Sequence, residues 1–263
     1  MNEVQPLHIA VAGASGRMGA ELVRLLVRDA AHYRLTAAWV GAGSDALGQD
    51  VGELAGLGPV GTRCTATGTA NAEVDAVVDF STVTATPDVA RAAGDRGAAW
   101  VCGVTGLDEV ARAALTASAQ QVPVLPADNF SLGVAVLKEL VVLARERLGA
   151  GFDIEIGEMH HRGKCDAPSG TARMLGRALG DHAGHIRSGA RAEGEIAYSV
   201  RRGGNVIGEH TVYFLGPHER LELTHRAEDR ALFAAGALAV VRWLVGRQPG
   251  IYHLDDYITD LND

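Results

Sequence analysis

The stretch His8-Ile9-Ala10-Val11-Ala12-Gly13-Ala14-Ser15-Gly16-Arg17-Met18-Gly19 decides the fold of the first half of the chain. Residues 8–12 are mostly apolar and end at a glycine, which predicts a short buried strand. After the glycines, apolar side chains recur at helical spacing at Met18, Leu22, Leu25 and Leu26. A second strand is predicted over Leu35 to Val40. This order of strand, glycine turn, helix and strand predicts one βαβ unit with parallel strands and a right-handed crossover.

The same alternation continues to about residue 130. Strands are predicted over residues 74–80, 98–102 and 122–125, and helices over 87–96 and 107–121. The Gly-, Ser- and Thr-rich region from Gly41 to Asn71 is predicted to be mostly loop. The repeated β–α order predicts an α/β fold with a Rossmann-like, doubly wound parallel sheet.

The character of the chain changes after Asp128. A helix is predicted over residues 134–148, a half-exposed strand over 152–159 and a helix over 168–179. A polar loop over 180–194 precedes strands at 196–200, 206–215 and 221–226 and a long apolar helix at 230–245. This part is therefore predicted to be a separate α+β domain.

The composition is that of an ordinary globular protein. Hydrophobic residues make up 47% of the 263 residues, so the chain can build a core and disorder is not expected. The net charge of −8 argues against nucleic acid or an anionic membrane as the main partner.

The cysteines and the chain start give an expectation about location. The three cysteines form no C-x-x-C pair, which favours a reducing compartment. The first residues lack the basic start and apolar stretch of a signal peptide. The sequence contains no run of about 18 apolar residues, so no membrane helix is predicted. We therefore expect a cytoplasmic protein.

Lysine is scarce. Only Lys138 and Lys164 are lysines among the 24 Lys and Arg residues. A lysine that persists in such a chain can mark a place where an always-charged arginine would not serve, although chance survival explains two residues equally well.

The glycine turn carries the first functional prediction. Gly13, Gly16 and Gly19 follow a strand and open a helix, the context in which glycines let the backbone approach a pyrophosphate at a helix N-terminus. Arg17 lies in the same turn and can clamp a phosphate. The alternative is a plain tight turn. No acid or arginine stands near Trp39 and Val40, so the local sequence does not choose between NAD and NADP.

The segment between Glu158 and Thr171 holds the highest concentration of side chains that could act in catalysis or bind a ligand. His160 and His161 are adjacent and point to opposite sides of a strand end, so one can carry a proton while the other orients a carboxylate. Lys164 can give up a proton, which arginine cannot. The helix start at residues 168–171 is suited to bind a carboxylate.

Two other interpretations of this segment stay open. His160, His161, Cys165 and Asp166 are all possible metal ligands, but their spacing does not match a usual zinc site, and we expect no metal. The segment could also be a polar loop with ordinary helix caps.

The segment Glu158-Met159-His160-His161-Arg162-Gly163-Lys164-Cys165-Asp166-Ala167-Pro168-Ser169-Gly170-Thr171-Ala172 resembles the signature E-x-H-H-x-x-K-x-D-x-P-S-G-T-A of the bacterial 4-hydroxy-tetrahydrodipicolinate reductase (dihydrodipicolinate reductase) family. The likeness extends over nearly the whole chain. It includes residues 11–19, 78–81, 103–106, 129–131, 208–211 and 260–262.

The resemblance implies a reductase that converts a small cyclic dicarboxylate to tetrahydrodipicolinate with NADH or NADPH, on the diaminopimelate route to lysine. It implies His160 as the acid/base residue, Lys164 as the proton donor, and His161, Gly170 and Thr171 as contacts to the substrate carboxylate. The cofactor contacts it implies, with Gly16 added from the glycine turn, are Gly13, Gly16, Arg17, Met18, Gly103, Thr105, Asn129 and Phe130.

The resemblance also implies two domains. Residues 1–130, completed by 231–263, would bind the dinucleotide. Residues 131–230, with a mixed open sheet, would bind substrate and assemble a homotetramer.

The chain departs from the family pattern at several places. Family members often carry Glu-Arg where this chain has Trp39-Val40. Val104 replaces the first Thr of G-T-T-G, Asp128 stands where Ala is frequent, and the stretch 180–194 is shorter. Two alternatives remain: an amino-acid dehydrogenase of similar build, such as an aspartate dehydrogenase, and a nucleotide-binding sensor without chemistry.

Overall fold

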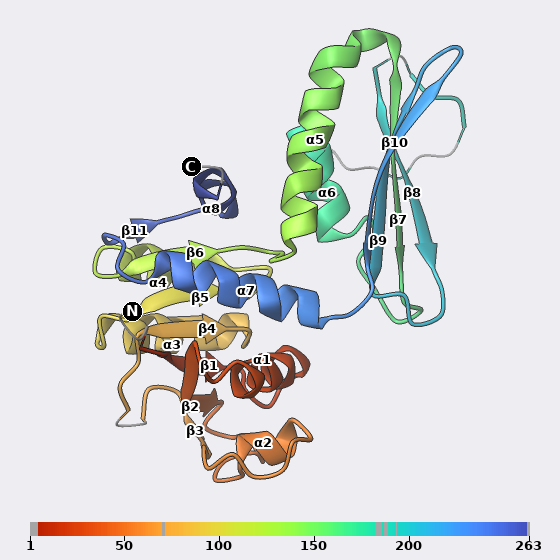
Figure 1. Cartoon of the computed structure of the whole chain (residues 1–263). Helices are drawn as coiled ribbons and strands as arrows, with labels where there is room; N and C mark the ends of the chain where they lie inside the picture. The colour runs from red at the N-terminus through yellow and green to blue at the C-terminus, as the bar shows by residue number, and fades with distance from the viewer. Residues whose placement is uncertain (1–4, 70–71, 182–185, 187–188, 193, 262–263) are drawn as a thin grey trace. The chain divides into compact units, whose positions relative to one another are not determined.

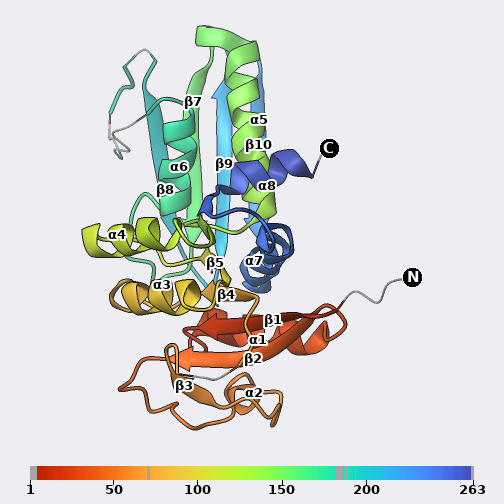
Figure 2. The ribbon, with the colours of Figure 1, turned by 90° about the vertical axis from the view of Figure 1, so that its left-hand side faces the viewer.

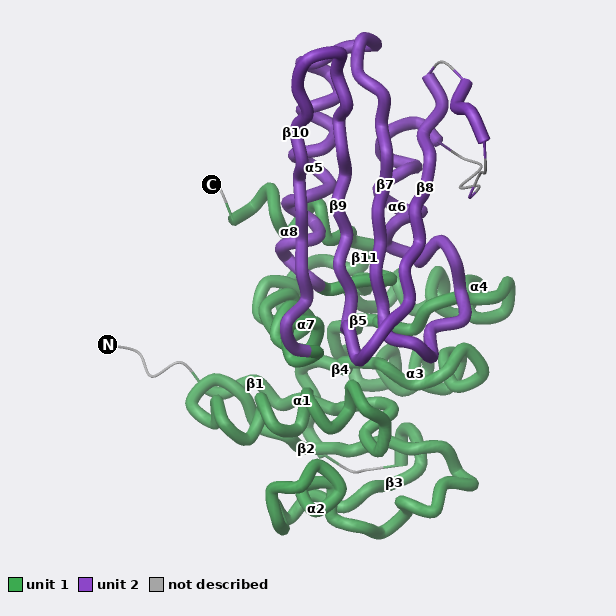
Figure 3. The backbone as a smooth tube through the Cα atoms, turned by 90° about the vertical axis from the view of Figure 1, so that its right-hand side faces the viewer, with its two compact units in different colours: residues 1–130, 230–263 green, residues 131–229 purple. Residues whose placement is uncertain are grey.

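The chain folds into two compact units. The structure is a computed structural model, and it describes residues 5–69, 72–181, 186, 189–192 and 194–261. Unit 1 comprises residues 1–130 and 230–263, and unit 2 comprises residues 131–229 (Figure 3). The division after Asp229 lies one residue before the boundary expected from the sequence.

Unit 1 is built on a seven-stranded sheet in which every neighbouring pair is parallel. The strand order is β11-β6-β5-β4-β1-β2-β3. The strands are β1 (Leu7–Ala12), β2 (Tyr33–Val40), β3 (Cys64–Ala66), β4 (Ala76–Asp79), β5 (Ala99–Cys102), β6 (Pro123–Pro126) and β11 (Gly250–Ile251). The order reverses between β1 and β4, which is the switch point of a doubly wound sheet.

Helices cover both faces of this sheet, as the sequence predicts for a doubly wound fold. The pair α1 and α7 lies on one face and the pair α3 and α4 on the other (Figures 1 and 2). The helices of unit 1 are α1 (Arg17–Arg28), α2 (Val51–Leu54), α3 (Thr86–Gly94), α4 (Glu109–Ser118), α7 (Ala231–Leu244) and α8 (Leu254–Asp260), with a 3₁₀ turn at Val83–Ala85.

The region from residue 41 to 71 differs from the prediction of mostly loop. It contains the helix α2 and the edge strand β3, which extends the sheet beside β2. Both elements are four residues or shorter, too short to give a periodic signal in the sequence. Within this region Asp50 caps α2 and accepts hydrogen bonds from the N–H groups of Gly52, Val60 and Gly61.

Unit 2 is a four-stranded mixed sheet, order β10-β9-β7-β8, in which only the β7–β8 pair is parallel. The strands are β7 (Asp153–His160), β8 (Ile196–Arg202), β9 (Gly208–Leu215) and β10 (Arg220–Ala227). The helices α5 (Leu132–Leu148) and α6 (Gly170–Ala178) cover one face, and a 3₁₀ turn spans Gly149–Gly151. Ile156, Val212 and Phe214 pack there against Val141 and Leu175. The mixed open sheet predicted for this part is confirmed, and part of the predicted loop 180–194 lies outside the described residues.

Candidate active site

The glycine turn of unit 1 has the geometry that the sequence predicts. Gly13 adopts a φ of +74° directly after β1, and its N–H and that of Ala14 both donate to the carbonyl of Trp39. A Cβ on Gly13 would lie 2.6 Å from the carbonyl oxygen of Phe80, so no larger residue fits. Gly16 is the N-cap of α1 and is exposed, as is Arg17. The first turn of a helix therefore stands open to an anion at the switch point of the sheet.

The other predicted cofactor residues lie at the same edge of this sheet. Because all its strands are parallel, the loops after β1, β5 and β6 share one edge. They carry Gly13, Gly16, Arg17 and Met18 after β1, Gly103 and Thr105 after β5, and Asn129 and Phe130 after β6. This edge of the sheet, with its glycine turn and open helix start, fits a dinucleotide.

The end of β2 carries no side chain that would indicate a preference for NAD or NADP. Trp39 is fully buried in the core, and the guanidinium of Arg96 lies 5.3 Å from its ring centroid. Trp39 packs in the hydrophobic core with Val77 and Val89, and an indole has no acceptor for a ribose hydroxyl, so Trp39 cannot replace the acidic residue of an NAD site.

In unit 2, His160 is held by a buried hydrogen bond to a carboxylate. The Nδ1 atom of His160 lies 2.5 Å from Oε2 of Glu158, whose side chain has no exposed surface. Arg202 donates to both Glu158 oxygens, over 2.8 Å and 2.9 Å. Burial acts to raise the pKa of Glu158, but the hydrogen bonds and charges of His160 and Arg202 outweigh it and lower the pKa to about 2. Glu158 is therefore ionised at neutral pH and accepts a hydrogen bond from the Nδ1–H group of His160.

The opposite ring nitrogen of His160 faces a glycine. A Cβ on Gly208 would lie 3.1 Å from His160 Nε2, closer than most real contacts. Since Nδ1 is bound to Glu158, Nε2 is the atom of His160 left to exchange a proton with a ligand.

Lys164 lies on the loop that follows β7. Its Nζ forms a 2.7 Å ion pair with Asp166 Oδ1, and its side chain is 22% exposed. Burial acts to raise the pKa of Asp166, but the hydrogen bond and charge of Lys164 outweigh it and lower the pKa. Arg202 anchors this loop, because it donates to the carbonyls of Lys164 and Asp166 over 3.2 Å and 2.6 Å. One arginine thus connects the strand that carries His160 with the loop that carries Lys164.

The predicted carboxylate site is the start of α6. Ser169 is the N-cap, and its Oγ accepts from the N–H of Ala172 over 3.1 Å. Gly170 is exposed, and no atom lies within 4 Å of the place a Cβ would take. Thr171 follows in the first turn. His161 is half-buried, and its Nδ1 accepts from the N–H of Gly163 over 3.2 Å, so the two adjacent histidines lie in different environments.

His210 links His160 to the start of α6, and the sequence did not single it out. Its ring meets the His160 ring edge-on, with centroids 5.2 Å apart, and its Nε2 lies 3.0 Å from Ser169 Oγ. Burial lowers the pKa of His210 to about 3, so this ring is neutral. His210 therefore contributes packing and a hydrogen bond to the site and carries no charge.

Three residues that build this site, Glu158, Arg202 and His210, were not among the site residues predicted from the sequence. Glu158 precedes His160 by two residues, and the two-residue period of a strand could have placed both on one face. Arg202 and His210 lie far along the chain and come to His160 only through the register of β8 and β9 beside β7.

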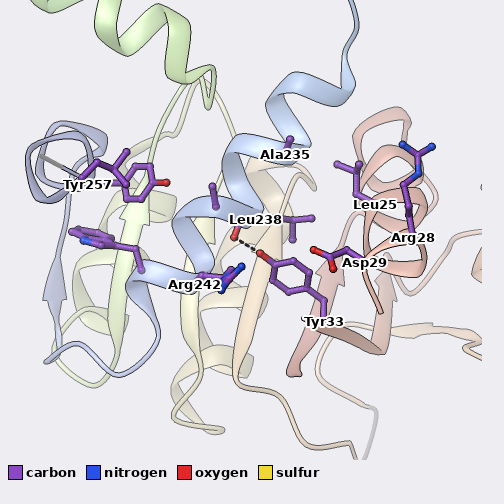
Figure 4. Close-up of a pocket in the computed structure, with 11 residues that line it drawn as sticks. Leu25, Arg28, Asp29, Tyr33, Ala235, Leu238, Arg242 and Tyr257 are labelled. Atoms are coloured by element: carbon purple, nitrogen blue, oxygen red, sulfur yellow. Dashed lines mark hydrogen bonds between the residues drawn. The ribbon is translucent and has the colours of Figure 1, made fainter. Parts of the chain in front are cut away.

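A cavity of about 590 Å³ lies elsewhere in unit 1, between α1, α7 and α8 (Figure 4). Tyr33, Arg242 and Tyr257 point into it, and the Tyr33 hydroxyl donates to the Leu238 carbonyl. None of its lining residues is a predicted site residue. Within the described ranges, no group of three or more His, Cys, Asp or Glu side chains could hold a metal ion.

A dinucleotide-type sheet joined to a unit that carries a buried histidine and a lysine four residues further on is typical of a nicotinamide-dependent oxidoreductase. Two family models match almost the whole chain. Residues 7–130 match "Dihydrodipicolinate reductase, N-terminus", and residues 133–258 match "Dihydrodipicolinate reductase, C-terminus". The chain belongs to the dihydrodipicolinate reductase family.

Curated relatives match this chain over nearly their full length. The 4-hydroxy-tetrahydrodipicolinate reductase of Afipia carboxidovorans is 44% identical over 96% of this chain and 97% of its own. That of Myxococcus xanthus is 41% identical with the same coverage. Among solved structures, the dipicolinate-bound dihydrodipicolinate reductase of Paenisporosarcina sp. TG-14 is 21% identical, with a TM-score of 0.72 over 96% of this chain and 99% of that one. That likeness supports the fold.

Proposed function

We propose that this protein reduces 4-hydroxy-tetrahydrodipicolinate to tetrahydrodipicolinate with NADH or NADPH, in the diaminopimelate route to lysine. The observation that carries the proposal is the segment from Glu158 to Thr171. It bears an acid/base histidine held by an ionised carboxylate, a lysine and a capped helix start. The names of relatives 41–44% identical support the same activity.

The substrate is a ring with two carboxylates, and the segment offers a cation and an anion-binding helix start. His161, Lys164 and the first-turn residues Gly170 and Thr171 hold the carboxylates. The positive end of the α6 dipole favours an anion there, and an exposed glycine lets it come close to the backbone.

The proton comes from His160 and Lys164. Glu158 fixes the tautomer of His160, so that Nε2 exchanges the proton on the side of Gly208. Lys164 donates a proton to the ring, which an arginine could not do. The reaction balances because the substrate gains one hydride and one proton and loses its hydroxyl as water.

The reduced nicotinamide, when bound, supplies the hydride to C4 of the ring. Its pyrophosphate is held by Gly13, Gly16 and Arg17 at the start of α1. The remaining contacts are expected from Met18, Gly103, Thr105, Asn129 and Phe130. No acidic side chain takes the place of Trp39, so either nucleotide can enter.

The protein is further proposed to work in the cytoplasm as a homotetramer assembled through unit 2. One face of the unit 2 sheet is covered by α5 and α6, and the residues of the other face on β9 stay half-exposed, which leaves a surface for a second copy. Light scattering should give a mass four times the chain mass of 27.5 kDa. Among the described helices, none is long and apolar enough to span a membrane.

A coupled assay tests the activity. The product of the preceding synthase is generated in the cuvette, and oxidation of NADH and NADPH is compared at equal concentration. Turnover that depends on the ring substrate is expected with at least one nucleotide. Oxidation of L-aspartate in place of this reaction would support an amino-acid dehydrogenase, and nucleotide binding without any turnover would support a sensor.

A further inference from the structure

Asp79 is a fully buried carboxyl group at the centre of the unit 1 sheet. It ends β4, where it lies opposite Ala12 of β1 and Cys102 of β5. Burial raises the pKa of Asp79 to about 6, and hydrogen bonding to Ser81 opposes this rise. A buried carboxyl group costs free energy, so its presence beside the switch point needs a physical reason.

The carboxyl group shapes the turn that follows β4. Asp79 Oδ1 accepts from the N–H of Ser81 over 2.9 Å, the pattern by which Asp stabilises a turn. The Asp79 carbonyl accepts from the N–H of Gly103 over 2.7 Å, and the N–H of Phe80 donates to the carbonyl of Ala12 over 3.1 Å. Hydrogen bonds on both sides of Phe80 therefore hold its backbone to β1 and to the start of the loop after β5.

Phe80 touches all three loops that are predicted to bind the nucleotide. Its carbonyl oxygen occupies the place that a Cβ on Gly13 would need, at 2.6 Å. Its ring covers Gly103, where a Cβ would lie 2.7 Å from Cδ1. The ring also meets Phe130 edge-on, with centroids 5.8 Å apart. A shift of Phe80 would therefore change the spacing between the glycine turn and the loops after β5 and β6.

We propose that Asp79 is a positioning residue for nucleotide binding, which acts by holding Phe80 between the three loops at the carboxyl edge of the sheet. The inference rests on the proposed function, because it takes this edge as the nucleotide site. Asp79 has no exposed surface, so it acts through Phe80 and does not touch the nucleotide. The hydrogen-bond acceptor at Oδ1 is the feature that matters, and an amide oxygen can replace it.

Three variants test the proposal by direct titration with NADH and with NADPH, without ring substrate. Asp79→Ala should raise both Kd values about tenfold, since it removes one buried hydrogen bond that shapes the site. Asp79→Asn should stay within about threefold of wild type, because its amide oxygen still accepts from Ser81. Ser118→Ala is the matched control. It removes a buried hydroxyl that donates to the Ala90 carbonyl between α3 and α4. Ser118 is the last residue of α4, whereas the loop after β5 precedes the first, so both Kd values should stay unchanged.

A folded Asp79→Ala variant that binds nucleotide like wild type would overturn the proposal, as would an Asp79→Asn variant that binds as weakly as Asp79→Ala. If Asp79→Ala does not fold, Phe80→Leu replaces it. This change keeps the Asp79–Ser81 bond but removes the ring over Gly103, and an unchanged Kd would again overturn the proposal. Wild-type protein that binds nucleotide but does not reduce the ring substrate refutes the proposed function alone, because the titrations need no turnover.

Discussion

Replacement of Arg202 by Met is the sharpest test of how unit 2 is held together. The substitution removes a guanidinium that donates to both oxygens of Glu158 and to the carbonyls of Lys164 and Asp166. It leaves the Glu158 carboxylate buried with His160 as its remaining side-chain partner. A buried charge that loses one partner destabilises the folded state strongly.

The loss of folding free energy expected for Arg202→Met can be worked out in two ways. The pKa of Glu158 lies at about 2 in place of 4.5, which corresponds to about 3 kcal/mol of stability at neutral pH from its partners together. Breaking a buried ion pair costs roughly 3–5 kcal/mol, and the low end applies because the Arg202 side chain is 20% exposed. We expect a loss of about 3 kcal/mol and a fall in Tm of about 6–12 °C.

Urea unfolding at neutral pH and steady-state kinetics measure the two consequences. The free energy of unfolding should fall as stated, and kcat should fall about 100-fold because the loop that carries Lys164 loses its anchor. Arg201→Met is the matched control. Arg201 is the preceding residue of β8 and is exposed, so its replacement should change stability by less than about 0.5 kcal/mol.

A double-mutant cycle with Glu158→Gln separates the ion pair from other effects of the substitution. If Arg202→Met costs no more than Arg201→Met, the buried pair does not stabilise the unit as argued. Strict additivity of Arg202→Met and Glu158→Gln would refute the pairing itself.

Three further outcomes are expected. Lys164→Arg should keep the charge and change the substrate KM little, but lower kcat by about 10²–10⁴, the usual effect of a lost proton donor; wild-type turnover would remove this role. Gly208→Ala should lower kcat with little change in Tm, because the added methyl crowds Nε2 of His160; unchanged kinetics would mean that this nitrogen is not used. Below pH 6.5 the unfolded chain binds a proton at His210 that the folded chain, with a pKa of about 3, does not, so stability is lost as the pH falls. His210→Gln, which can still donate to Ser169, should reduce this loss by up to about 1.4 kcal/mol per pH unit in urea titrations at stepped pH, and an unchanged slope would contradict a neutral buried ring.

The candidate site shows how far sequence patterns reach. His160, His161 and Lys164 could be singled out because the chemistry of a segment is visible in its residue types and spacing. The partner that holds His160 could not, because Arg202 is 44 residues from Glu158 and meets it through the parallel register of β7 and β8. The scarcity of lysine pointed to Lys164, but the fold supplied its anchor.

The sequence alone determined the doubly wound sheet and the glycine turn, and it singled out the segment that carries His160, His161 and Lys164. Each depends on local rules: the periods of strand and helix, and the small size of Gly13. Tertiary structure decided that β3 extends the sheet and that Trp39 is buried in the core. It also decided that the Asp79 carboxyl group accepts from Ser81 and so shapes the turn that holds Phe80. These features depend on which distant segments become neighbours, and that is fixed by strand register and by packing, since a buried polar group must find its partner wherever the fold brings one.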